Sequence, residues 1–153
     1  MKTGVITDCF KLQLDESIKL AGKLGFEGVQ IYATTGEFSP EVLTDKRKAE
    51  IKKLLMENQL EISALCGDMG GYGFQIEKDN PERVEKTKRI IDLAWEFGVP
   101  VITTHIGVIP DDKSNPRYEV MLKALNECGA YAKEKNVTLA IETGPEKAAT
   151  LLA

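Results

Sequence analysis

The chain has 153 residues, of which 42% are hydrophobic, 29% are charged and 7% are aromatic. This balance is typical of one soluble globular domain, here residues 1–153, and it excludes disordered, collagen-like and membrane-spanning chains. Lysine and arginine number 20 against 24 acidic residues, and the resulting net charge of −4 argues against a nucleic-acid partner.

The distribution of charged residues and cysteines indicates whether the protein binds membranes and in which compartment it lies. The densest basic stretch, residues 45–53, mixes lysine and arginine with acids, which predicts a solvated helix face rather than a membrane anchor. Cys9, Cys66 and Cys128 are scattered and form no CxxC pair, which is typical of reduced thiols in the cytoplasm. Residues 1–8 lack the long apolar stretch of a signal peptide, and no apolar run is long enough for a membrane helix.

Four helices are predicted in chain order, each with a recognisable end. The residues that follow them tolerate a left-handed backbone and lead directly into β-rich runs: Gly25, Asn58, Gly98 and Asn136. Intervals of 33, 40 and 38 residues separate these ends, the length of one strand–helix unit with its loops. The predicted starts are Asp15 as an N-cap, then Ser39-Pro40 and Asn80-Pro81; the fourth helix covers residues 120–132, and a further helix begins after Pro145.

Five strands alternate with these helices. The predicted strands are Thr3–Asp8, Val29–Ala33, Glu61–Cys66, Val101–Thr104 and Thr138–Glu142. Their apolar character with little alternation is expected where helices cover both faces of a strand. The β-α order with right-handed crossovers therefore predicts an α/β fold with a parallel sheet, either an open doubly wound sheet or an arc of a barrel.

Polar residues gather where the predicted strands end. In both architectures ligands bind at the carboxyl ends of the strands. His105, the only histidine, follows the fourth strand, and Glu142 ends the fifth, where a carboxylate would otherwise be costly. Structural roles fit these residues as well: a hydrogen-bonded His105, a helix-capping Glu142, a turn at Asp68 and a buried, unreactive Cys66. The glycine-rich residues 67–71 match no phosphate-binding motif.

A divalent-metal site is the more specific hypothesis for Glu142 with His105 beside it. Carboxylate oxygen and imidazole nitrogen suit Mn, Mg, Co or Zn. Such an ion polarises a carbonyl while a carboxylate moves a proton on the adjacent carbon. Two candidate ligands alone do not define a site.

Three segments carry a family resemblance: residues 63–71 (SALCGDMGG), 101–110 (VITTHIGVIP) and 140–146 (AIETGPE). They closely resemble the sugar phosphate isomerase/epimerase family of the xylose isomerase-like barrel group, and the likeness extends from Gly4 onward. The resemblance implies a (β/α)8 barrel and a metal-dependent sugar isomerase or epimerase. Its substrate would be a small-molecule sugar or sugar phosphate.

The resemblance also assigns roles to individual residues. Glu142 matches the family's metal-binding glutamate at the end of the fifth strand, and His105 matches the pocket histidine that also binds metal in some relatives. Asp68, Thr104, Gly107 and Glu146 are weaker candidates for lining the sugar pocket. The related apurinic endonuclease family needs several histidines for its zinc cluster, which one histidine and a net charge of −4 do not support.

The chain departs from the family in length. A full barrel typically needs about 250 residues, and the family's other metal ligands lie on the sixth to eighth strands. The sequence therefore predicts an incomplete barrel of five strands and four helices, with an incompletely ligated metal site and weak or no turnover. Its two unpaired edges predict homo-oligomers.

The competing function is a non-catalytic α/β half-barrel module that oligomerises or binds a small polar ligand. An independent flavodoxin-like sheet is disfavoured, because residues 8–11 (DCFK) offer no phosphate-binding loop after the first strand.

Overall fold

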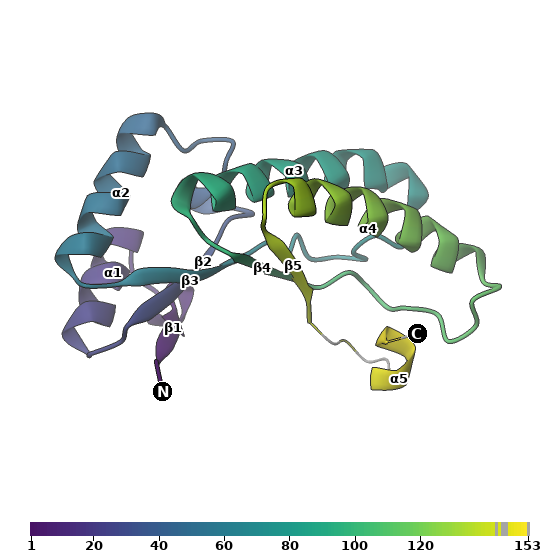
Figure 1. The fold of residues 1–153 in the computed structure, drawn as a ribbon, viewed down its shortest axis with the longest axis horizontal. Coiled ribbons are helices and arrows are strands. Elements are labelled where there is room, and N and C mark those ends of the chain that lie inside the picture. The colour runs from purple at the N-terminus through teal and green to yellow at the C-terminus, as the bar shows by residue number, and fades with distance from the viewer. Residues whose placement is uncertain (143, 145–146, 153) are drawn as a thin grey trace.

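The computed structural model describes residues 1–142, 144 and 147–152, and it contains one parallel sheet whose strands alternate with helices (Figure 1). The strands lie in sequence order: β1 (Gly4–Ile6), β2 (Gly28–Tyr32), β3 (Glu61–Cys66), β4 (Val101–Thr104) and β5 (Thr138–Ile141). The α-helices are α1 (Leu14–Lys23), α2 (Asp45–Glu57), α3 (Asn80–Phe97), α4 (Pro116–Glu134) and α5 (Ala148–Leu151). Short 3-10 helices are η1 (Thr7–Phe10), η2 (Gly36–Phe38) and η3 (Glu77–Asp79).

This architecture confirms the predicted α/β class and the arc of a barrel, since each strand pairs in parallel with the next in the chain. The sheet edges are β1 and β5. β3 has the predicted bounds, whereas β1 is shorter than predicted because Thr7 and Asp8 turn into η1. Glu142 lies just after β5, and its amide donates to the carbonyl of Thr104.

Two predicted helix starts are wrong. The N-cap of α1 is Gln13, and Asp15 lies in the first turn, where its carboxylate faces Arg47. Ser39 forms a tight turn whose carbonyl accepts from two amides, and α2 begins six residues later. Its N-cap is Thr44, whose hydroxyl accepts a hydrogen bond from the Arg47 amide. The Ser39-Pro40 pattern therefore marks a turn before the helix.

Three of the four predicted left-handed residues are confirmed: Gly25, Gly98 and Asn136 have φ of 82°, 68° and 56°. At the end of α2 the left-handed residue is Gln59, with a φ of 57°, one position after the predicted Asn58, whose φ is −98°. Asn58 is the C-cap of α2, and its side-chain amide donates to the carbonyl of Leu54 in the last turn.

The hydrophobic core lies between the sheet and the helices. Val29, Ile31, Leu65 and Ile102 are at most 2% exposed, and they pack with buried residues of the first three helices. A second cluster joins Phe74 and Ile106, in the loops after β3 and β4, to Met121 and Cys128 of α4. α3 and α4 pack side by side above the sheet (Figure 1).

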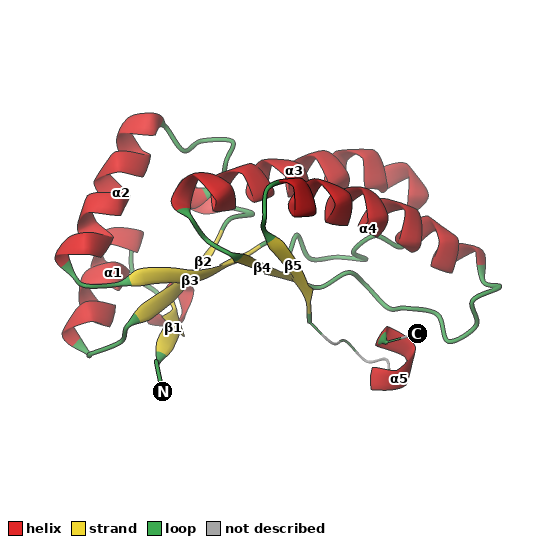
Figure 2. Ribbon diagram, viewed as in Figure 1, coloured by secondary structure: helices red, strands yellow, loops and turns green. Residues whose placement is uncertain are grey.

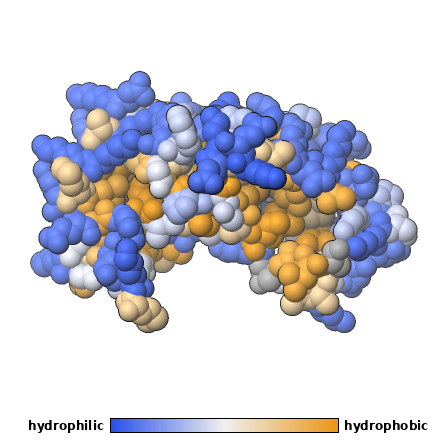
Figure 3. Space-filling model, viewed as in Figure 1, coloured by the Kyte–Doolittle hydropathy of each residue, from blue (hydrophilic) through white to orange (hydrophobic). Residues whose placement is uncertain are grey.

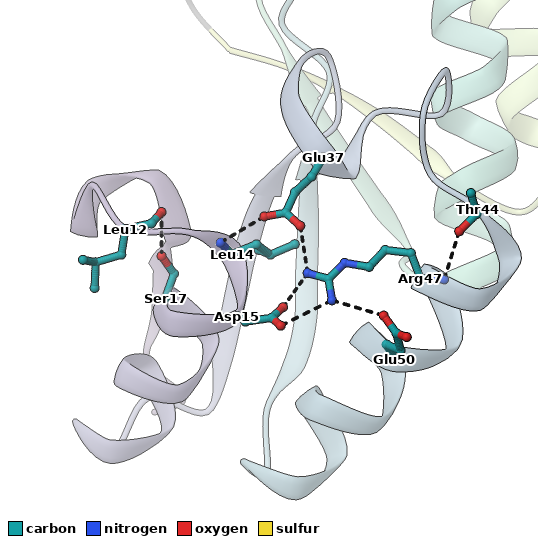
Figure 4. A network of polar contacts seen from close by, with 8 residues as sticks. All are labelled: Leu12, Leu14, Asp15, Ser17, Glu37, Thr44, Arg47 and Glu50. Atoms are coloured by element: carbon teal, nitrogen blue, oxygen red, sulfur yellow. Dashed lines mark hydrogen bonds and ion pairs between the residues drawn. The ribbon is translucent and has the colours of Figure 1, made fainter.

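An arginine joins the first two helices to the β2–α2 loop (Figure 4). The Arg47 guanidinium contacts the carboxylates of Asp15, Glu37 and Glu50, with 2.8 Å between Nη2 and Glu37 Oε2. The opposite oxygen of Glu37 accepts from the amide of Leu14. The predicted solvated face therefore holds for Lys46, whose side chain is 88% exposed, but is wrong for Arg47, which is 23% exposed.

The other face of the sheet carries polar and small side chains. Gln30 Nε2 donates to Thr103 Oγ1 at 2.8 Å, which bridges β2 and β4 across β3. Figure 2 shows α2, α3 and α4 on the side of the sheet away from both termini and α5. Figure 3 shows hydrophobic residues at the surface along the sheet and α5, between hydrophilic helices. No helix of the described residues has the length and apolar character needed to cross a membrane.

Candidate functional site

The carboxyl ends of the strands bring the polar residues onto one rim. Because all five strands are parallel and lie in sequence order, Asp8, Tyr32, Cys66, His105 and Glu142 follow one another along it. In parallel α/β folds this edge is where ligands bind. The rim therefore contains the candidate site.

His105 and Glu142 form the central pair of the rim. His105 Nε2 lies 3.2 Å from Glu142 Oε2, and the two side chains are 48% and 50% exposed. The register of β4 and β5 places them together, because Thr104 pairs with Ile141 and each functional residue is the next in its chain. The structure thus brings the two principal candidates within hydrogen-bonding distance and leaves both open to solvent.

Cys66 and Tyr32 extend the site along β3 and β2. Burial raises the pKa of the Cys66 thiol, and the charges of Asp68 and Glu142 raise it further. Cys66 in turn raises the pKa of Tyr32, with smaller contributions from burial and from Asp68 and Asp8. The carboxylates of Asp8, Asp68 and Glu142 therefore place negative charge near this part of the rim. Cys66 is therefore held as a neutral thiol rather than as a thiolate nucleophile.

Gly73 and Gly107 allow the loops after β3 and β4 to pack closely against each other. The Phe74 amide donates to the Ile106 carbonyl at 2.9 Å. A Cβ on Gly73 would lie 2.1 Å from Ile106 C and O, and a Cβ on Gly107 would lie 2.4 Å from the Tyr72 carbonyl oxygen. Both glycines also have positive φ, 57° and 92°. The close contacts at Gly73 and Gly107 thus constrain the backbone that follows His105.

The weaker candidates occupy different environments. Asp68 is half-buried, and its Oδ1 accepts from the Gly70 amide at 2.8 Å. Thr104 is only 5% exposed, and its hydroxyl lies 3.4 Å from the Gly67 carbonyl and 3.1 Å from that of His105. Gly107 packs against the Tyr72 carbonyl, which leaves no room for a Cβ at this position. Glu146 lies outside the described residues.

The donor set of the rim fits part of a metal site. Imidazole nitrogen and carboxylate oxygen at 3.2 Å are suitable ligands for a divalent ion. Within residues 1–142, 144 and 147–152, no three histidine, cysteine, aspartate or glutamate side chains converge to hold an ion. The described part of the chain therefore offers two ligands where divalent ions take four or more.

Sequence reasoning named Tyr32 only as a strand-end residue and missed the Gln30–Thr103 hydrogen bond. A glutamine inside an otherwise apolar β-run was the available signal for Gln30. The loop contact at Gly73 gave no local signal, because its partner lies in another loop.

Comparison with family models decides the fold family. The model described as "Xylose isomerase-like TIM barrel" matches residues 18–152. The chain belongs to this family. This confirms the family resemblance drawn from the sequence and the interpretation of the sheet as part of a barrel.

Solved structures support the same fold. A xylose isomerase domain protein from Planctomyces limnophilus has 23% identity and a TM-score of 0.82, with 98% of this chain and 56% of that one covered. The probable 3-DHS dehydratase AsbF of Bacillus anthracis has 18% identity and a TM-score of 0.77, with 99% and 57% covered. A D-tagatose 3-epimerase-like protein has 21% identity and a TM-score of 0.75, with 97% and 55% covered.

The chain therefore spans a little over half the length of these three solved proteins. Identities in this range establish the fold and leave the reaction open. Comparison with curated proteins gave no match.

Proposed function

We propose that the chain carries the His105–Glu142 part of the active site of a metal-dependent sugar isomerase or epimerase, cytoplasmic and acting by proton transfer next to a carbonyl. The observation that carries this proposal is the 3.2 Å separation of His105 Nε2 and Glu142 Oε2 on the open rim. One similar solved structure, a xylose isomerase-like TIM barrel protein from Mycobacterium smegmatis (16% identity, TM-score 0.68), is a magnesium complex, which supports a divalent ion.

In this proposal Glu142 holds the ion, and His105 orients the substrate or serves as a second ligand. A bound Mn, Mg, Co or Zn ion supplies Lewis acidity that polarises the sugar carbonyl. Glu142 presents Oε2 to the imidazole of His105. The reaction then needs a carboxylate to exchange the proton on the carbon beside the carbonyl.

Surrounding residues support this pair. The Glu142 amide is fixed by the Thr104 carbonyl at 3.0 Å, and the Gly73–Ile106 contact holds the loop that follows His105. Asp68 and Thr104, with Gly107 and Glu146, remain candidates for contacts with the sugar. Because only two metal ligands are present in the described residues, we expect this chain alone to give weak or no turnover.

The test is an assay of unphosphorylated and phosphorylated ketohexoses with added Mn, using Glu142→Gln and the matched control Glu134→Gln, an exposed position on α4. We expect traces of turnover at most, removed by Glu142→Gln and unaffected by the control. Robust turnover that depends on Glu142 would contradict the incomplete site. Turnover independent of Glu142 would contradict the proposed function.

A specific observation favours the second candidate, a half-barrel module that self-associates. β1 and β5 each pair with one strand, and beside β5 the side chains of Ile141 and Leu122 are more than a third exposed. Unpaired strands beside apolar surface favour association between copies. Light scattering of Ile141→Lys tests this. Reduced mass supports association through β5, and an unchanged dimer or a wild-type monomer contradicts it.

A further inference from the structure

A cavity of about 370 Å³ lies between the first half of α3 and the middle of α4, two helices that pack side by side (Figure 1). Val84 and Ala124, each 4% exposed, form the deepest part of its apolar wall. The charged residues that line it are all exposed and so lie at its mouth: Glu77, Glu85, Lys123 and Glu127. Its size and its apolar wall are those of a site for a small molecule.

Asn80 lines the same cavity and has an amide oxygen without a partner. The residue is 8% exposed, and its Nδ2 donates to the carbonyls of Phe74 at 3.1 Å and Val120 at 3.4 Å. These two bonds fix the orientation of the amide, because only its nitrogen can donate to a carbonyl. Oδ1 is buried and accepts no hydrogen bond from any described residue. Since buried polar atoms are normally paired, a ligand with an N–H or O–H group would supply the missing donor.

The charges at the mouth favour a cationic donor. Lys88 Nζ lies 3.1 Å from Glu85 Oε1 and 2.7 Å from Glu127 Oε1, so one lysine serves two carboxylates. Glu77 forms no ion pair with any other described residue. Even with Lys123 counted, the three carboxylates exceed the lysines by one charge. Because no three potential ligand side chains of the described ranges converge on a metal ion, an organic ammonium group fits this lining better than a metal ion.

We infer that the cavity between α3 and α4 is a binding site for an alkylammonium group, whose N–H donates to Asn80 Oδ1 and whose charge is balanced by Glu77. The carbon chain of the ligand packs against Val84 and Ala124. The inference goes beyond the proposed function, because the residues that line this cavity belong neither to the rim at the strand ends nor to the His105–Glu142 pair.

Chemical-shift mapping of the full chain tests the inference, with propylammonium, 1-propanol and propionate as probes of similar size. We expect propylammonium to shift the side-chain NH₂ signals of Asn80 and to bind about tenfold more tightly than either other probe, as a charged donor should. Glu77→Gln should weaken propylammonium binding about two- to fivefold, as expected for one exposed ion pair, and leave 1-propanol binding unchanged. Glu134→Gln, exposed at the far end of α4, should behave as the wild type. N-acetyl-lysine methylamide identifies the source of the group: tighter binding than propylammonium indicates a lysine side chain of a partner, and weaker binding indicates a free amine.

Other outcomes overturn the inference. These are no shift of the Asn80 side-chain signals with propylammonium, equal affinities for propylammonium and 1-propanol, or tighter binding of propionate, which would mark an anion site at Lys123. Asn80→Ala removes the acceptor, and unchanged propylammonium binding at the Val84 amide, in a variant with the circular dichroism of the wild type, would also overturn it. Glu142→Gln should leave propylammonium binding unchanged. The inference and the proposed function therefore fail independently.

Discussion

Replacing Gly73 by alanine should separate the loops after β3 and β4 and displace His105. The new Cβ would lie 2.1 Å from Ile106 C and O, far inside contact distance, so the backbone must move. A left-handed alanine costs about 1 kcal/mol and overpacking about 1–3 kcal/mol more. We therefore expect the free energy of unfolding to fall by about 2–4 kcal/mol.

Gly70→Ala is the matched control. Gly70 lies in the same loop with a φ of 64°, but an added Cβ would meet nothing within 4 Å. Its cost should be about 1 kcal/mol, the backbone contribution alone. Urea unfolding followed by circular dichroism gives both free energies, and the ring signals of His105, the only histidine, report its position by NMR. Equal losses in the two variants, with an unchanged His105 signal in Gly73→Ala, would refute the loop contact.

Three further predictions concern Arg47 and the cysteines. Arg47→Lys should lower the free energy of unfolding by about 1 kcal/mol, because lysine cannot bridge several carboxylates. Lys46→Ala is the control and should have almost no effect. Equal losses of unfolding free energy in the two variants, measured by urea unfolding, would contradict this. A thiol reagent at pH 8 should modify exposed Cys9 quickly and wholly buried Cys128 only on unfolding, and rapid labelling of both would contradict the packing. Burial raises the pKa of Cys128 from 9.0 to about 11, so its contribution to stability is complete below pH 9 and lost as the pH rises through 11. Cys128→Ala should reduce the fall in unfolding free energy over that interval, and an identical fall in both proteins would contradict the shift.

Strands β2 to β5 were predictable because each β-rich run closely follows a helix that ends at a glycine or asparagine, as Glu61–Cys66 follows Asn58. The pairing of His105 with Glu142 followed from the same reasoning, since residues that follow adjacent parallel strands must lie together. Helix starts were less predictable. Ser39-Pro40 and Asn80-Pro81 have the same pattern, but the first forms a turn and the second lies in α3.

Contacts between distant segments could not be predicted from local sequence. Gly73 is crowded by the loop after β4, and Arg47 meets carboxylates from α1 and η2 as well as from its own helix. Each depends on how segments far apart in the chain approach, which periodicity and capping patterns do not encode. The cavity between α3 and α4 has the same origin, because Asn80 and Val120 reach it from separate helices.

Titration with Mn²⁺ while recording the His105 ring signals tests the central claim most directly, since the chain has a single histidine. A paramagnetic ion held by Glu142 next to the imidazole should broaden these signals at low Mn²⁺ concentration. In Glu142→Gln at least about tenfold more Mn²⁺ should be needed, because an amide is a far poorer ligand than a carboxylate. Glu134→Gln should behave as the wild type. Equal broadening in the wild type and Glu142→Gln, or none in either, would contradict a metal site at this pair.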